Sequence, residues 1–388
     1  MKGFCTSTGG ATSHVAILAR ALDIAAVAGI EAAVLDIEDG TPLILDGSKG
    51  SLRVNPSPEL REETLARQAA IKEQKEKDLA VAGEPAVTTD GTRLEVVANI
   101  SGIEEAKESI RLGGEGVGLL RSEFLFLDRS TAPTEDEQYE VYRDVLLALN
   151  GYPLIVRTLD VGGDKPLPYL PMPVEENPFL GQRGIRIGLE RPELFRSQAR
   201  AILRAGAHGK IRIMFPMIAT LQEIRDARKM LEEEREKLGV APIEVGIMVE
   251  VPSTAVLAEQ FAREVDFFSV GTNDLTQYCL AMDRGHPKLA AKLDAMDPAV
   301  LRLIGQAAQG AHTHGKWLGV CGGLASVPDA VPILIGLGVD ELSVSVPALP
   351  SVKAEVRRWS ASDCRQLAEK ILNAGSGSEI RELVENAR

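Results

Sequence analysis

The sequence predicts an α/β protein whose main part is a (β/α)8 barrel. Beyond about residue 85, short β-branched or apolar runs alternate with amphipathic helical stretches, which is typical of parallel βα units. A barrel of this kind takes about 250 residues, which the remaining chain can supply. A doubly wound open sheet is the alternative that the same alternation allows. The eight runs expected to form strands are Leu94–Ile100, Val117–Leu120, Leu154–Thr158, Ile211–Phe215, Val245–Glu250, Phe267–Val270, Trp317–Cys321 and Leu342–Val344.

Two further stretches precede the predicted barrel. Residues 1–56 combine a Gly-, Thr- and Ser-rich opening with short β-like runs at 43–45 and 51–54. Residues 57–84 carry dense charges of both signs and only sparse apolar positions, which predicts a long, exposed linker helix. The expected domains are therefore residues 1–56, the linker helix 57–84 and the barrel 85–388.

Composition argues against several classes of protein. Hydrophobic residues make up 45% and charged residues 26% of the 388 residues, which is typical of a globular protein and not of a disordered chain. No apolar run approaches the length of about 18 residues that indicates a transmembrane helix, and the start does not resemble a signal peptide. The net charge of −13 disfavours general binding to nucleic acid or to an anionic membrane. We therefore expect a cytoplasmic protein that binds any anionic ligand in a local basic pocket.

Polar residues stand at the predicted carboxyl ends of the strands, where a barrel of this type carries its chemistry. Arginines, carboxylates and a thiol at one mouth predict a polyanionic substrate held beside a divalent cation. A simpler explanation, that strand ends are polar wherever they leave the core, accounts for one or two positions. The four cysteines lack any Cys-x-x-Cys spacing, which disfavours a zinc or disulfide scaffold. The strand-end residues are Asn99, Arg121, Arg157, Glu250, Asn273, Asp274 and Cys321.

The most informative stretch is Gly9-Gly10-Ala11-Thr12-Ser13-His14, followed by Val-Ala-Ile-Leu-Ala-Arg. Paired glycines let the backbone approach a ligand closely, and Thr12 or Ser13 can cap the helix that follows. His14 then falls in the first helical turn, where backbone N–H groups and the helix dipole favour a phosphate. A lone histidine is usually structural, but this context predicts that His14 is a phosphate-accepting nucleophile.

This stretch resembles the phosphohistidine motif of Enzyme I of the phosphoenolpyruvate:sugar phosphotransferase system, a motif shared by pyruvate phosphate dikinase and phosphoenolpyruvate synthase. The resemblance to Enzyme I covers essentially the whole chain. It implies that residues 1–56 are part of a phosphohistidine, or swivelling, domain and that the barrel binds phosphoenolpyruvate. The barrel segments that resemble Enzyme I are 119–126, 157–165, 176–181 and 271–278.

The resemblance also implies a reaction and a set of site residues. Phosphoenolpyruvate would transfer its phosphoryl group to His14 and leave as pyruvate, with Cys321 donating the proton to carbon. Glu250 and Asp274 would hold Mg²⁺, an ion that prefers hard oxygen ligands. The side chains implied around the phosphate and carboxylate of the substrate are Arg121, Arg157, Lys165, Arg183, Asn273 and Arg284.

The same resemblance implies binding partners. The sequence also departs from the Enzyme I pattern in two places. Enzyme I passes phosphate to the histidine carrier protein HPr in sugar uptake and forms a homodimer through the barrel. Its chain carries further residues ahead of the motif, including a helical insert that docks HPr, whereas this chain starts a few residues before His14; we therefore expect weak labelling of His14 and very poor transfer to HPr. Gly323 stands where Enzyme I usually has Glu, a variation more like the Enzyme I module of multiphosphoryl transfer proteins. The alternatives are a non-catalytic phosphoenolpyruvate-binding or dimerising module, and a fragment of a dikinase or synthase.

Overall fold

The computed structural model describes residues 3–7, 24–47, 49–127, 129–163, 167–286 and 288–388. His14 and Lys165 lie outside the described residues. The chain divides into two compact units, and each is described by itself. The first unit comprises Met1–Val81 and Met282–Leu293, and the second comprises Ala82–Ala281 and Asp294–Arg388.

The first unit contains two small sheets and a long helix. Parallel strands β1 (Gly3–Thr6) and β2 (Ala25–Ala28) form one sheet, and the antiparallel strands β3 (Leu43–Asp46) and β4 (Ser51–Val54) form the other. Helix α2 (Pro58–Ala80) is capped by the Ser57 side chain, which accepts a hydrogen bond from the Leu60 N–H at 3.3 Å. Most of α2 is exposed, as its charge pattern predicts. The short 3-10 helices of this unit are η1 (Ala32–Asp36) and η5 (Ala290–Lys292).

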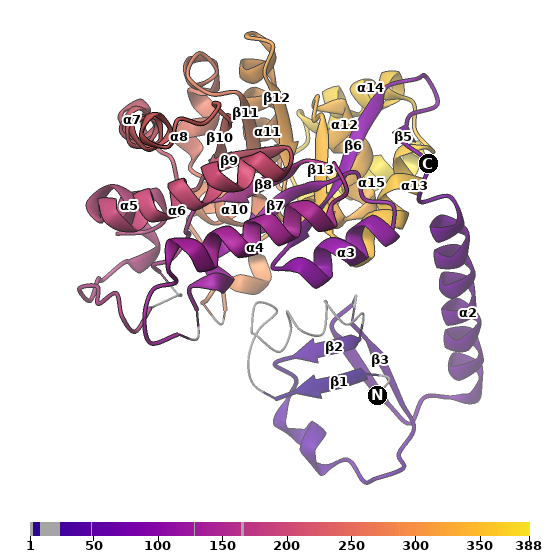
Figure 1. Cartoon of the computed structure of the whole chain (residues 1–388). Coiled ribbons are helices and arrows are strands. Elements are labelled where there is room, and N and C mark those ends of the chain that lie inside the picture. The colour runs from indigo at the N-terminus through magenta and orange to yellow at the C-terminus, as the bar shows by residue number, and fades with distance from the viewer. Residues whose placement is uncertain (1–2, 8–23, 48, 128, 164–166, 287) are drawn as a thin grey trace. The chain divides into compact units, whose positions relative to one another are not determined.

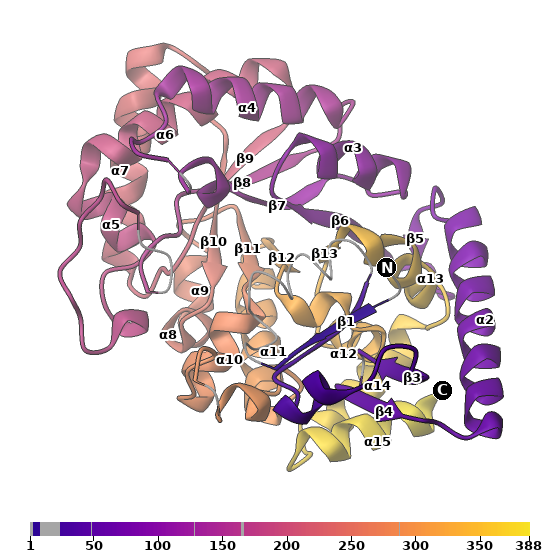
Figure 2. The same ribbon diagram turned by 90° about the horizontal axis from the view of Figure 1, so that it is seen from below.

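The second unit is a closed barrel (Figures 1 and 2). Nine strands form one sheet, in which the short β5 (Ala86–Val87) runs antiparallel to β6 and the other eight are parallel neighbours in chain order. Pairing of β13 with β6, which places Ser345 opposite Asn99, closes the ring. This closure confirms the predicted (β/α)8 barrel and excludes the open sheet. The eight strands are β6 (Arg93–Ile100), β7 (Val117–Arg121), β8 (Leu154–Arg157), β9 (Ile211–Phe215), β10 (Glu244–Val249), β11 (Phe267–Val270), β12 (Trp317–Val320) and β13 (Glu341–Ser345).

Helices follow the strands and lie outside the ring of strands (Figure 2). Two of the longer ones start with capping boxes, Thr134 with Glu137 on α4 and Thr220 with Glu223 on α7. No helix among the described residues is long and apolar enough to cross a membrane. The α-helices of this unit are α3 (Ile103–Arg111), α4 (Glu135–Ala148), α5 (Ile185–Glu190), α6 (Pro192–Ala205), α7 (Leu221–Leu238), α8 (Pro252–Val256), α9 (Ala258–Phe261), α10 (Thr272–Leu280), α11 (Pro298–His312), α12 (Val331–Gly336), α13 (Leu349–Val356), α14 (Ala361–Ile371) and α15 (Gly377–Ala387). Its 3-10 turns are η2 (Ser122–Leu125), η3 (Pro178–Leu180), η4 (Gly206–His208), η6 (Gly323–Ser326), η7 (Pro328–Ala330) and η8 (Val346–Ala348).

The strands bury side chains on both faces. Outward-facing strand residues pack with the helices in one large core, and a smaller cluster fills the barrel interior. The Phe267 and Trp317 rings stack at 4.7 Å in this interior. The interior cluster consists of Leu119, Ile155, Met214, Met248, Phe267 and Cys321, with Trp317 packed against it. Because the interior is filled, a substrate has room only at the mouth of the barrel.

Candidate functional site

Arg157 is the buried cation at the end of β8. Its guanidinium lies 2.6 Å from a Glu123 carboxylate oxygen and 3.0 Å from an Asp160 oxygen. Burial by itself would lower the pKa of Arg157, but the negative charges of Glu123, Asp160 and Glu250 raise it overall. Its Nε atom has no hydrogen-bond partner among the described residues. Arg157 is therefore a fixed positive charge that still has one donor to offer.

A second buried arginine, Arg183, precedes α5. It donates to both oxygens of Asp274, at 2.7 and 3.1 Å, and to both oxygens of Asp160, each at 3.3 Å. Its guanidinium also lies 5.8 Å from the centroid of the Phe179 ring. Burial lowers the pKa of Arg183, and the two aspartates more than offset this effect. In this structure Arg183 is therefore engaged mainly with carboxylates of the protein.

Glu250 directly follows β10 and faces several other carboxylates. One of its oxygens accepts the Met217 N–H at 2.8 Å, and only 1% of the residue is exposed. Burial raises the pKa of Glu250 first, and the charges of Asp274 and Asp160 raise it further, against the opposing effect of the two arginines. Gly271 gives the carboxylate its space, since a Cβ there would come within 2.8 Å of Oε1. Repulsion among these carboxylates marks a position where a cation would be stabilised.

Arg121, at the end of β7, differs from the other two arginines. Its side chain forms no hydrogen bond or ion pair with any residue that the structure describes. Burial lowers the pKa of Arg121, the positive charge of Arg157 lowers it further, and Glu123 and Glu105 oppose the fall. A largely desolvated guanidinium beside a second cation is costly unless an anion joins it. Arg121 is therefore the clearest anion-binding group at this mouth.

The Cys321 thiol lies at the same mouth of the barrel, directly after β12. It is 4% exposed, and its Sγ contacts the Val270 carbonyl oxygen at 3.6 Å. Burial raises the pKa of the thiol to about 12, and the negative charge of Glu250 contributes to the rise. Cys321 is therefore protonated near neutral pH, as a proton donor must be and a thiolate nucleophile would not be.

The two asparagines of the predicted set hold the mouth together. The Asn99 amide donates to the Cys321 and Ser343 carbonyl oxygens, each at 3.0 Å, and its oxygen accepts the Ser343 hydroxyl at 2.7 Å. It thereby joins β6 to the strands that close the ring. The Asn273 oxygen accepts the Gly323 N–H at 3.1 Å, which leaves its amide donors for other partners.

The structure thus brings together Arg121, Arg157, Arg183, Glu250, Asp274, Asn273 and Cys321 on one barrel mouth. Arg284 belongs to the segment Met282–Leu293, which groups with the first unit. The sequence analysis missed Glu123 and Asp160, both 1% exposed. Each follows a strand-end arginine by two or three residues, and that spacing was the available signal.

The donor chemistry of the mouth fits Mg²⁺. Within the described part of the chain, no group of three or more acidic, His or Cys side chains is placed to hold a metal by itself. Mg²⁺ commonly binds one or two protein carboxylates and takes its other ligands from water and substrate phosphate. Glu250 and Asp274 supply two carboxylates of that kind at adjacent strand ends, with no further protein ligand required.

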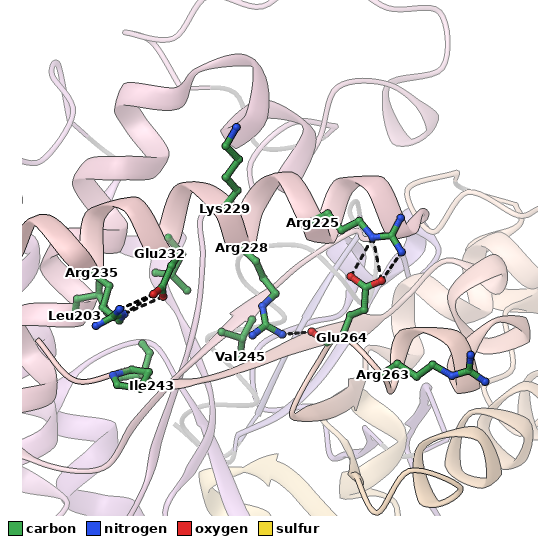
Figure 3. Close-up of a pocket in the computed structure, with 12 residues that line it drawn as sticks. Leu203, Arg225, Arg228, Lys229, Glu232, Arg235, Ile243, Val245, Arg263 and Glu264 are labelled. Carbon is green, nitrogen blue, oxygen red and sulfur yellow. Dashed lines mark hydrogen bonds and ion pairs between the residues drawn. The ribbon is translucent and has the colours of Figure 1, made fainter.

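A cavity of about 520 Å³ lies elsewhere on the barrel (Figure 3). It is lined from α7 and from the residues before β10 and β11, at the amino ends of the strands. Arg225 and Arg235 in it are paired with Glu264 and Glu232, and the Arg228 guanidinium donates to the Glu264 carbonyl oxygen. Because these residues are mostly exposed and paired, and chemistry in this fold sits at the opposite mouth, the mouth with Arg121 and Glu250 is the functional candidate.

Comparison with known proteins agrees with this architecture. Residues 74–361 match the PEP-binding domain of the PEP-utilising enzymes, and residues 1–50 match the mobile domain of the same enzymes. The chain belongs to this family of phosphoenolpyruvate-utilising enzymes.

Its relatives point to one branch of the family. The chain is 47% identical over 386 residues to a phosphoenolpyruvate-protein phosphotransferase of Geobacillus stearothermophilus, covering 98% of this chain and 67% of that protein. It is 47% identical to the Bacillus subtilis phosphoenolpyruvate-protein phosphotransferase, covering 98% of this chain and 68% of that protein. A multiphosphoryl transfer protein of Rhodobacter capsulatus is 52% identical over 383 residues. The match covers 99% of this chain but only 46% of that relative's length.

Proposed function

We propose that this chain transfers the phosphoryl group of phosphoenolpyruvate to His14 and releases pyruvate. The observation that carries the proposal is the desolvated Arg121 guanidinium, which lies beside Arg157 and forms no hydrogen bond or ion pair with the described residues. It lies on the same mouth as a protonated thiol and two clustered carboxylates. This combination matches the needs of a small phosphorylated carboxylate that must gain a proton on carbon. Membership of the PEP-utilising family supports the same substrate.

Substrate binding is assigned to the basic groups of the mouth. Arg121 holds an anionic group of phosphoenolpyruvate because no described carboxylate forms an ion pair with it. The Arg157 Nε, which has no hydrogen-bond partner among the described residues, offers a second donor. The Asn273 amide adds a neutral donor. Phosphoryl transfer needs positioning and charge neutralisation above all, and these fixed donors supply both. Lys165, Arg183 and Arg284 complete the substrate-binding set that we propose.

Glu250 and Asp274 are the proposed Mg²⁺ ligands. When bound, the ion would neutralise charge on the substrate oxygens. The raised pKa of Glu250 supports this metal assignment. Burial raises it first, and repulsion from Asp274 and Asp160 adds to the rise; a cation at this place would relieve that repulsion. Asp274 would have to share its oxygens between the ion and Arg183, since that arginine binds both of them here.

Cys321 supplies the proton that completes the reaction. A ring nitrogen of His14 forms a bond to phosphorus, the bridging P–O bond breaks, and its electron pair stays on the enol oxygen. The methylene carbon then takes the thiol proton, and the electrons of the C=C bond form the new C–H bond as the ketone forms. A thiol with a pKa near 12 holds its proton until this strongly basic carbon needs it.

Relay of the phosphate to an HPr-type carrier in sugar uptake, a homodimer through the barrel and a cytoplasmic location are further parts of the proposal. Support for them comes from the relatives named phosphoenolpyruvate-protein phosphotransferase.

The proposed reaction is tested by incubating the purified chain with phosphoenolpyruvate labelled in its phosphate, with and without Mg²⁺. We expect an acid-labile, base-stable label that requires Mg²⁺ and is absent from His14→Ala. Absence of label in the unsubstituted chain, with calorimetric binding of phosphoenolpyruvate retained, would instead favour a non-catalytic binding module.

A further inference from the structure

A buried carboxyl group in the barrel interior has no part in the site described so far. Glu341 begins β13, is 2% exposed, and its Oε1 atom has no hydrogen-bond partner among the described residues. Burying a polar atom without a partner costs on the order of 1–3 kcal/mol. An unsatisfied group of this kind therefore calls for a functional explanation.

Strand register places Glu341 beneath the Cys321 thiol. Gly319 on β12 lies opposite Glu341 on one side and opposite Ser269 of β11 on the other. A Cβ at Gly319 would lie 3.0 Å from the Glu341 Oε1, so the carboxyl group occupies the space that this glycine leaves. Cys321 comes two residues after Gly319, directly after β12. Its side chain therefore points to the same side as position 319, into the barrel. Ser269 is fully buried, and its hydroxyl lies close enough to the Cys321 thiol to lower the pKa of that thiol by hydrogen bonding.

The other side of Glu341 leads to solvent. Glu95 on β6 is directly opposite Glu341 in the register that closes the ring, and Glu95 is exposed. An exposed carboxylate, a buried carboxyl group and a buried hydroxyl thus lie in register on neighbouring strands, and the hydroxyl adjoins the thiol.

We propose that Glu341 returns a proton to Cys321 after each turnover, along the row formed by Glu95, Glu341 and Ser269. This inference rests on the proposed function, in which Cys321 protonates enolpyruvate. Once the thiol has given its proton to carbon, the thiolate takes the Glu341 carboxyl proton, with water carrying it over the remaining gap. The S–H bond re-forms, Glu341 becomes a carboxylate, and water at the Glu95 end restores its proton. No oxidant or reductant is needed.

The surroundings of Glu341 suit a proton carrier. Burial raises its pKa to about 8, and the negative charges of Glu95 and Asp340 add to the rise, while Arg212 opposes it. Glu341 acts electrostatically on the Cys321 thiol, which directly follows β12. A negative charge on Glu341 raises the pKa of the thiol. The group is thus protonated at neutral pH and weaker as a base than the thiolate that it serves.

The test follows exchange of the methyl protons of pyruvate in deuterium oxide by NMR, using the full chain with Mg²⁺ and inorganic phosphate. Exchange requires that Cys321 take a proton from carbon and then trade it with solvent, so it reports the relay. Glu341→Gln keeps the size of the side chain but cannot carry the proton. We expect it to lower the exchange rate on the order of tenfold or more, with an unchanged KM for pyruvate. Glu104→Gln, the same change at an exposed position of α3, is the matched control and should exchange at nearly the unsubstituted rate.

Infrared spectroscopy gives a readout that does not depend on catalysis. The carbonyl stretch of a protonated carboxylic acid should be present at pH 7, disappear near pH 8 and be missing from Glu341→Gln. Unchanged exchange in Glu341→Gln would overturn the relay alone and leave the function of Cys321 standing. Absent exchange in the unsubstituted chain, or equal exchange in Cys321→Ala, would overturn the proposed role of Cys321 and the relay with it.

Discussion

Arg183 binds both carboxylate oxygens of Asp274, at 2.7 and 3.1 Å, although the two residues are 91 positions apart in the chain. The same guanidinium also binds Asp160. Arg183 therefore neutralises part of the negative cluster around Glu250 and occupies the oxygens that the proposed Mg²⁺ would share. This relationship would make stability and the proposed Mg²⁺ binding interdependent at the mouth of the barrel.

Arg183→Met should lower the free energy of unfolding by about 3–5 kcal/mol, because the buried Asp274 and Asp160 carboxylates each lose an ion pair. Mg²⁺ should restore more of that loss than it adds to the unsubstituted chain, since the ion would now compensate the same carboxylates. Urea denaturation with increasing Mg²⁺ measures both effects. Arg225→Met, which breaks a surface pair with Glu264, is the control. Equal Mg²⁺ dependence in all three proteins would contradict the assignment of the metal.

Arg121 and Arg157 should respond differently to the same substitution. Arg121→Met should reduce the rate of phosphoryl transfer on the order of 10²–10³-fold. It should leave the free energy of unfolding unchanged or higher, since this desolvated guanidinium has no ion pair with the part of the chain that the structure describes. Arg157→Met should lose activity and also stability, because the buried Glu123 and Asp160 carboxylates would each lose an ion pair. Rapid-quench labelling and urea denaturation separate the two cases, and a near-normal rate in Arg121→Met would remove it from the substrate site.

Asn99 should contribute to stability and not to substrate binding, although it stands at a strand end. Asn99→Ala removes the hydrogen bonds that join β6 to Ser343 and to the Cys321 backbone, so we expect about 2–3 kcal/mol less stability. The affinity for phosphoenolpyruvate, measured by calorimetry below the unfolding transition, should change by less than about tenfold. A large loss of affinity with normal stability would show that Asn99 contacts the substrate.

Glu341 should make the protein less stable as pH rises. Its folded pKa of about 8 lies above the usual value for Glu, so the folded state binds more protons than the unfolded state between these two values. The free energy of unfolding should therefore be highest below the unfolded pKa and fall, by roughly 3–5 kcal/mol, as pH rises through the folded pKa near 8. Glu341→Gln should remove this fall, whereas Glu104→Gln, at an exposed position, should not. Parallel curves for Glu341→Gln and the unsubstituted chain would contradict the prediction.

Sequence alternation alone was enough to predict the eight strands and their order. Each strand buries both faces, so its apolar run is short, continuous and bounded by turns, and the helical stretches between the runs make the strands parallel. The same reasoning located Arg121, Arg157, Glu250 and Cys321, because carboxyl ends of parallel strands share one mouth of a barrel. The site residues that follow a strand directly were therefore predictable from local pattern.

Only the tertiary structure decided how these side chains pair. Glu123 and Asp160 were overlooked because their partner is an arginine whose position depends on the strand pairing. Asn99 became a structural residue through contacts with strands more than 200 positions away. Glu341 was left outside the predicted strand Leu342–Val344, and closure of the ring placed it opposite Gly319 and Glu95. The physical reason is that hydrophobic period is a local property of the chain, whereas burial of a charge depends on the register between strands distant in sequence.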